Sequence, residues 1–224
     1  MTSQRNKILI SLAGLAVFLF LAAGSTLNRN SNTNNSNSNS APTPGTRTTS
    51  YKNSSSHFIG KLQENYVDFT FDYPDTWKQD SEAGKGTSQN FVKVERRSAD
   101  DITLENLAVG YFTGQKELMV KLAGQLSNQL KPSFPGYRKV SEGATRVGSY
   151  DGYEFRFTSR SNKSARGDLD IWGRAILLPG NESRKGAVLM MLATSASPDV
   201  KSVADVGEKG DLPLILSSFK FAGD

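Results

Sequence analysis

The stretch YVDFTFDYPDTWKQD, residues 66–80, decides the fold because it marks where a folded domain begins. Apolar and polar residues alternate over residues 66–73, the period of two that indicates a strand with one buried face. The apolar positions are Val67, Phe69, Phe71 and Tyr73. Pro74 has no backbone N–H, so it is predicted to end the strand. After the turn, Trp77 is expected to fold back into the core.

Downstream of this strand, the hydrophobic period changes twice. The segments FVKVERR (residues 91–97) and LAVGYF (residues 107–112) alternate and are predicted to be strands. Over residues 115–131 leucines recur every fourth position, which predicts a helix with one apolar face. Thr113 is expected to cap this helix and Pro132 to end it.

The second half of the domain is predicted to contain two hairpins and a final helix. ATRVGSYDGYEFRFTSR indicates two strands joined near residues 150–152, where Gly152 permits a tight turn. LDIWGRAILL and AVLMMLATS are joined by the polar segment PGNESRKG. DLPLILSSFKF is predicted to start as a short helix, with Asp211 near its cap and Pro213 in its first turn. The expected fold class is α+β: one mainly antiparallel sheet of six to seven strands, with at least two helices packed on its faces.

The first 28 residues are typical of an export signal. Arg5 and Lys7 precede an uncharged apolar run over residues 8–23. The length of this run favours a retained transmembrane anchor, whereas the small residues Ala22, Ala23 and Gly24 allow cleavage of a signal sequence instead. Residues 29–56 are rich in Asn and Ser and are predicted to be a disordered linker, because they offer almost no apolar surface to bury. The globular domain is therefore expected over residues 57–224, outside the cytoplasm.

Charge and cysteine content exclude several function classes. The formal net charge of the chain is +5, yet residues 1–56 hold five basic residues and no Asp or Glu, which leaves 22 basic against 22 acidic residues in the domain. A nucleic-acid partner is not expected, because phosphate binding needs a cationic excess on the folded part. The chain has no Cys, so disulfides, thiol nucleophiles and Cys-ligated metals are excluded.

A family resemblance follows from these pieces. A strand ending in FDYPDTW, a central helix, paired hairpins and a terminal LILSSFKF together resemble the PsbP-like domains, the superfamily of the photosystem II extrinsic subunit. That superfamily also includes the Ran-binding nuclear import factor of yeast and exported bacterial proteins. The resemblance spans about residues 58–221 and implies an α/β/α sandwich in a binding or assembly protein. The Asn/Ser-rich linker departs from the photosynthetic members, so a photosystem role is not expected.

One group of residues is a candidate for partner binding. In DIWGR, Asp170, Trp172 and Arg174 share one face of a predicted strand, and Trp and Arg are favoured anchors in protein interfaces. The competing interpretation is that a packed element covers this face, because Ile176 and Leu178 lie on the same side.

Catalytic motifs are weak in this sequence. His57 is the single histidine and lies at the junction of linker and domain, which argues against a His-dependent site. Ser217 and Lys220 match S-x-x-K without the companion motifs of penicillin-binding enzymes. Two carboxylate pairs at alternate positions are better interpreted as solvated strand faces; these are Asp68 with Asp72 and Asp168 with Asp170.

The sequence thus predicts a membrane-tethered, extracytoplasmic, noncatalytic module that binds a protein or an envelope component. No metal or other cofactor is expected. The alternative is a cell-envelope hydrolase with an unconventional Ser/Lys or carboxylate site.

Overall fold

The computed structural model describes residues 47–86, 88–164, 167–180 and 185–222. The expected signal or anchor over residues 1–28, and the linker as far as residue 46, lie outside these ranges. Within the described ranges, no helix has the length and apolar character needed to cross a membrane.

The larger of two sheets has seven strands in the order β3-β4-β5-β9-β8-β7-β6, and each neighbouring pair is antiparallel. Its strands are β3 (Lys78–Gln79), β4 (Asn90–Arg97), β5 (Thr103–Thr113), β6 (Arg138–Val147), β7 (Tyr150–Ser164), β8 (Gly167–Pro179) and β9 (Lys185–Thr194). The segments predicted to be strands supply all of these strands except the two-residue β3. β9 lies at the centre of the sheet, in agreement with its apolar sequence.

The second sheet contains the stretch that marks the start of the domain. β2 (Phe69–Pro74) is its central strand, flanked by β1 (Thr48–Lys52) and β10 (Lys220–Phe221). Two expectations are corrected here. The strand begins at Phe69 and belongs to a separate small sheet. The linker expected over residues 29–56 overlaps β1, because the backbone of this polar strand pairs with five residues of β2, from Thr70 to Pro74.

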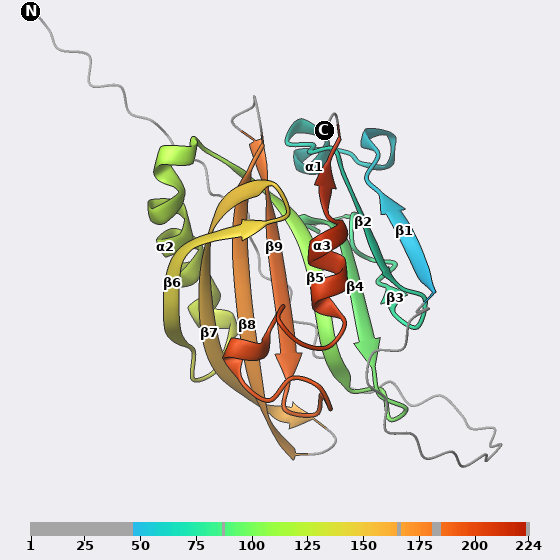
Figure 1. Cartoon of the computed structure of the whole chain (residues 1–224), viewed down its shortest axis with the longest axis vertical. Coiled ribbons are helices and arrows are strands. Elements are labelled where there is room, and N and C mark those ends of the chain that lie inside the picture. The colour runs from blue at the N-terminus through green and yellow to red at the C-terminus, as the bar shows by residue number, and fades with distance from the viewer. Residues whose placement is uncertain (1–46, 87, 165–166, 181–184, 223–224) are drawn as a thin grey trace, which may run out of the picture.

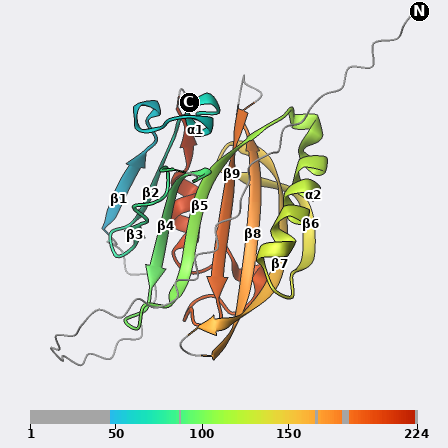
Figure 2. The same ribbon diagram turned by 180° about the vertical axis from the view of Figure 1, so that it is seen from behind.

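Three layers result from this arrangement. α2 (Met119–Leu130) covers one face of the large sheet, whereas α3 (Leu212–Ser218) and the small sheet cover the other face (Figures 1 and 2). One outer layer therefore mixes strands with a helix, which differs from the α/β/α sandwich expected from the resemblance. The remaining helices are short: α1 (Lys61–Glu64) and the 3-10 turns η1 (Ser55–His57), η2 (Lys116–Leu118), η3 (Lys131–Ser133) and η4 (Val203–Asp205).

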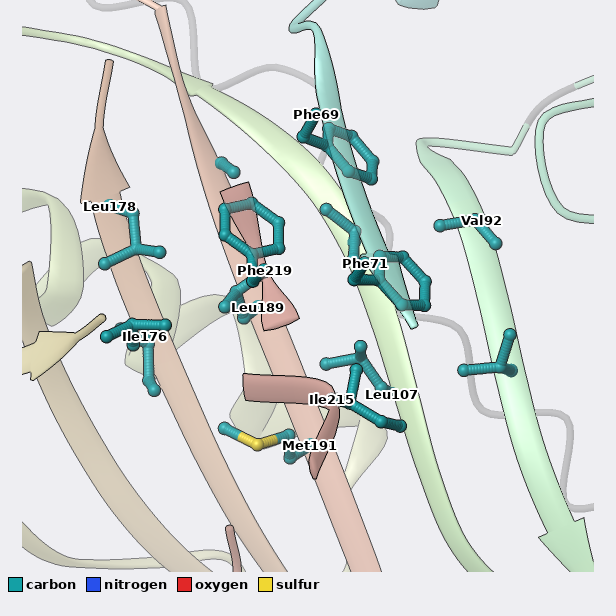
Figure 3. Close-up of a cluster of buried hydrophobic side chains, with 14 of the residues drawn as sticks. Phe69, Phe71, Val92, Leu107, Ile176, Leu178, Leu189, Met191, Ile215 and Phe219 are labelled. Carbon is teal, nitrogen blue, oxygen red and sulfur yellow. The ribbon is translucent and has the colours of Figure 1, made fainter. Parts of the chain in front are cut away.

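Two apolar cores lie on opposite faces of the large sheet. The first joins the small sheet and α3 to β4, β5, β8 and β9, and its centre is shown in Figure 3. Phe69 stacks on Phe219 in this core with ring centroids 5.5 Å apart. Trp77 is 3% exposed and belongs to the same core, as expected. The second core lies under α2, where Leu122, Leu126 and Leu130 are buried.

Two local expectations are wrong. Thr113 is the last residue of β5, and the helix that follows has no side-chain cap. The β6–β7 turn lies at residues 148–149 and not at residues 150–152. Gly148 has a φ of 57°, a left-handed conformation that glycine adopts without strain, so it is the turn-forming glycine.

Candidate partner-binding surface

The three candidate residues lie on β8 as the alternation predicts. Asp170, Trp172 and Arg174 occupy every second position of the strand, on the face that carries Ile176 into the first core. Asp170 is exposed and accepts a hydrogen bond from Arg160 on β7, with the Nε–Oδ1 distance at 3.3 Å. Trp172 is half-buried and packs against the first core. The accessible part of this face therefore consists of Asp170, which is paired with Arg160, and of part of the Trp172 ring.

Arg174 is buried and is bound within the chain. Its Nε donates to Glu154 Oε2 over 2.8 Å, and its Nη1 donates to Glu208 Oε1 over 2.9 Å. Longer hydrogen bonds reach the carbonyl oxygen of Val206 and the hydroxyl of Thr145, each over 3.4 Å. These contacts use the guanidinium donors inside the molecule. The geometry supports the interpretation that packing covers this end of the face, and a partner-binding role for the three residues stays a prediction.

A second arginine completes this cluster. Arg156 lies directly opposite Arg174 on β7, and both arginines bind Glu154 and Glu208. Arg156 Nη1 also donates to three backbone carbonyl oxygens, those of Val203, Ala204 and Val206. We call Glu154, Arg156, Arg174 and Glu208 the Arg174 network. It fastens the segment between β9 and α3, residues 195–211, onto the sheet.

A glycine permits this close approach. Gly207 has a φ of 76°, and a Cβ at this position would lie 2.7 Å from Arg174 Nη1. A side chain here would therefore displace the guanidinium and strain the backbone.

Burial acts to raise the pKa of Glu154, but the positive charge of Arg174 and the hydrogen bonds from both arginines and Thr145 outweigh it, so the pKa is lowered.

Both ends of the same segment are held by Arg96 on β4. Its Nη2 lies 2.6 Å from Glu105 Oε1 and 2.7 Å from Asp199 Oδ2, and its Nη1 lies 3.3 Å from Asp211 Oδ2. Trp77 Nε1 donates to the same oxygen of Asp211 over 2.9 Å. We call Arg96, Glu105, Asp199 and Asp211 the Arg96 network. It joins the sheet to both ends of the β9–α3 segment.

Glu105 is the most enclosed charged residue of this network, since its side chain is 0% exposed. Oε1 accepts from Arg96 and from Ser197, whereas Oε2 is buried without a hydrogen-bond partner and faces Gly210. Burial raises the pKa of Glu105, and Arg96 and Ser197 only partly offset the effect. The neighbouring carboxylates Asp199 and Asp211 raise it further.

Neither network was predicted from the sequence, although one signal was present. Arg96 follows Val92 and Val94 at alternate positions, so the alternation places a cation on the buried face of β4. Arg174 precedes Ile176 in the same way. A charge at an inward position needs a buried partner. The partner residues themselves come from the β9–α3 segment, whose path across the sheet has no periodic pattern.

The weaker catalytic candidates have structural contacts. Ser217 Oγ donates to the carbonyl oxygen of Leu214 within the final helical turn, and Lys220 is exposed on β10. His57 is exposed in η1. Asp72 accepts a hydrogen bond from the Ser50 hydroxyl. Among the residues that the structure describes, no group of three or more His, Cys, Asp or Glu side chains is arranged to hold a metal ion.

No protein-family model matches the sequence, and no curated protein matches it. Among solved structures, the chain is similar to a protein of Bacteroides thetaiotaomicron, with a TM-score of 0.43, 10% identity and coverage of 70% of this chain and 46% of the other. This chain therefore spans less than half of that relative. LpqN of Mycobacterium tuberculosis, which is involved in cell envelope biogenesis, has a TM-score of 0.45 and 12% identity, with coverage of 78% and 91%. A third similar structure is the cyanobacterial PsbP of Synechocystis, with a TM-score of 0.47 and 14% identity, which covers 82% of this chain and 98% of the other. The solved structures to which this chain is similar thus include a PsbP, a member of the family that the sequence itself resembles.

Proposed function

We propose that the chain is an extracytoplasmic, membrane-tethered and noncatalytic module that binds a protein or envelope component. The observation that carries this proposal is the order of segments at the N-terminus. Arg5 and Lys7 precede the apolar run over residues 8–23, and a polar Asn/Ser-rich stretch separates this run from the domain. This order is that of an export signal followed by a spacer.

The contacts of the candidate residues weigh against a hydrolytic role. The buried arginines and carboxylates of both networks are hydrogen-bonded to one another and fasten the β9–α3 segment. Ser217, the nucleophile of the hydrolase alternative, donates a hydrogen bond to the carbonyl oxygen of Leu214. These groups have structural partners, so no observation favours the second candidate function.

Fractionation and mass measurement test the tether. The full chain, expressed in a bacterial host, is expected in the membrane fraction with its N-terminus intact, and its domain is expected to be digested by protease added to spheroplasts. A matched variant, Arg5→Glu with Lys7→Glu, is expected to accumulate inside the cell, because export signals require a basic start. A soluble, mature species that begins near Ser25 would refute the anchor and leave export intact. Protection of the domain in spheroplasts would refute the proposal altogether.

Binding and catalysis are tested on the exported full chain. Photocrosslinking amino acids at surface positions of the domain are expected to give one adduct of defined mass with an envelope component. A fluorophosphonate probe is expected to leave Ser217 unlabelled. Labelling that is lost in Ser217→Ala would establish the hydrolase alternative instead.

A further inference from the structure

The longest exposed edge of the molecule is β6. This ten-residue strand is the last of the large sheet and pairs only with β7 within the part of the chain that the structure describes. Of its residues only Val147 is buried, and Val140 is 49% exposed. The edge strand β3 has two residues, β10 has two and β1 has five. In Figure 1, the upper part of β6 crosses in front of the large sheet.

An edge strand of this length is a template for a further strand. The alternate N–H and C=O groups on its outer side have no strand partner in the sheet, and such groups pair readily with an added extended chain. Natural sheets usually shorten or cover their edges, as the two-residue edges β3 and β10 do here. Gly143 and Ala144 have small side chains, so a second backbone can approach the middle of the strand closely.

The charge of β6 favours one kind of partner. The strand carries Arg138, Lys139 and Arg146 against the single acid Glu142. Lys139 pairs with Glu142 over 2.8 Å, and Arg146 lies 3.7 Å from Asp151 of β7. With both acids counted, one positive charge remains in excess. Two copies of β6 paired antiparallel over all ten residues would place Lys139 opposite Arg146 of the copy, and like charges that face each other across strands are destabilising. A parallel pair of copies brings the same cations side by side. Self-pairing is therefore disfavoured, and an acidic strand is complementary.

We infer that β6 binds an extended, acidic segment of a partner protein, which adds to the large sheet as an eighth strand. This inference rests on the proposed binding function and names its surface and the chemistry of its partner. Main-chain hydrogen bonds supply the affinity, and the cations of β6 select acidic side chains.

Synthetic peptides test the inference on the full chain in detergent at 0.15 M salt. A labelled ten-residue peptide of alternating Thr and Glu is expected to bind at least about tenfold more tightly than one of alternating Thr and Lys, measured by fluorescence anisotropy. Strand addition uses every second amide of the peptide. N-methylation of three amides of one parity should therefore abolish binding, whereas methylation of the other parity should leave it unchanged.

Charge reversal on the strand supplies the matched control. Arg138→Glu with Arg146→Glu should invert the preference, so that the lysine peptide binds more tightly. Lys52→Glu with Lys220→Glu changes the net charge equally on the small sheet and should leave the preference unchanged; both lysines are exposed. The basic residues of the N-terminal segment are common to all variants, so they cannot cause the inversion.

Three results would overturn the inference: equal binding of the two peptides, an equal effect of both methylation parities, or dimers in which β6 amides are protected from hydrogen exchange without any peptide. None of them affects the fractionation and crosslinking results that test the proposed function. A chain that crosslinks to an envelope component through other positions, and does not bind the acidic peptide, would retain the function and lose this site.

Discussion

The Arg174 network and the Arg96 network fasten the same β9–α3 segment, but they balance charge differently. In the Arg174 network two arginines face two glutamates. In the Arg96 network one arginine faces three carboxylates. The pKa of Glu154 is lowered in the first network, and the pKa of Glu105 is raised in the second. Two clusters of similar composition are therefore expected to respond to pH in opposite directions.

The difference shows that burial alone does not decide whether an acid is stabilised as a carboxylate. Glu154 receives hydrogen bonds from both arginines, so both of its oxygens are satisfied. Glu105 shares its single arginine with Asp199 and Asp211, and one of its oxygens has no partner. The number of hydrogen-bond donors around each carboxylate determines whether its pKa is lowered or raised.

The largest effect is expected at Trp77, which supports the Arg96 network from the core side. Trp77→Ala removes a buried ring and the N–H donor to Asp211, and it should cost about 3–5 kcal/mol of unfolding free energy. Denaturant titration measures this. Trp172→Ala is the matched control, because its half-buried ring should give a smaller loss. A Trp77→Ala protein as stable as the wild type would contradict a structural role for FDYPDTW.

Loss of Arg174 should rank second. Arg174→Met keeps the aliphatic stem and leaves Glu154 and Glu208 with Arg156 alone, so a cost of about 3 kcal/mol is expected, as for breaking one side of a buried ion pair. Arg160→Met removes an exposed ion pair with Asp170 and should cost less than about 1 kcal/mol. Equal effects of the two changes, measured by thermal and denaturant unfolding, would show that burial of the network is unimportant.

Glu154→Gln should be intermediate and dependent on pH. The ionised carboxylate stabilises the fold above the unfolded pKa of 4.5, and this contribution is lost as the pH falls through the lowered pKa of the folded state. The variant should therefore be about 2 kcal/mol less stable at pH 7 and approach the wild type in acid. Urea titrations between pH 3 and pH 7, on the order of one per pH unit, measure the convergence. A constant difference across this range would contradict a lowered pKa.

The smallest effect is expected for Glu105→Gln, because burial of the Glu105 charge, which raises its pKa, offsets much of what the ion pair with Arg96 contributes. The informative result is whether the stability difference between variant and wild type rises or falls with pH. Because the folded pKa of Glu105 lies above 4.5, the wild type loses stability as the pH rises from 4.5 through that pKa, whereas Gln does not titrate. The stability of the variant relative to the wild type should therefore increase with rising pH, whereas that of Glu154→Gln should decrease. Parallel curves for the two variants would remove the distinction between the networks.

The strands and main helix could be predicted because their signals are local. Alternation identified β4, β5 and β7, and the leucine repeat identified α2, since one face of each element is buried. β9 was identified by its apolar run, which is buried on both faces. The division into two sheets could not be predicted, because β2 alternates in the same way whichever sheet it joins. β1 was missed for a related reason: its sequence is polar, and its pairing with β2 supplies the order that its side chains do not.

The candidate site was predicted only in outline. The common face of Asp170, Trp172 and Arg174 follows from the period of a strand. The burial of Arg174 depends on Glu208, which lies 34 residues away in the β9–α3 segment, and no local pattern reports such a contact. The exposure of β6 is likewise a property of its place in the sheet.

The small sheet also affects the order in which the domain can fold, because it joins strands that lie far apart in the sequence. β2 receives β1 from before it and β10 from the end of the chain, and the Asp72 N–H donates to Ser218 Oγ across 146 residues of sequence. Contacts of such long range form late, because a long loop must close before they contribute. Phe219 and Phe221 therefore complete the first core only after α3 and β10 have been synthesised and are free to fold. If the chain is exported as proposed, β2 stays unpaired on its β10 side until Lys220 and Phe221 have crossed the membrane, so the first core is completed late.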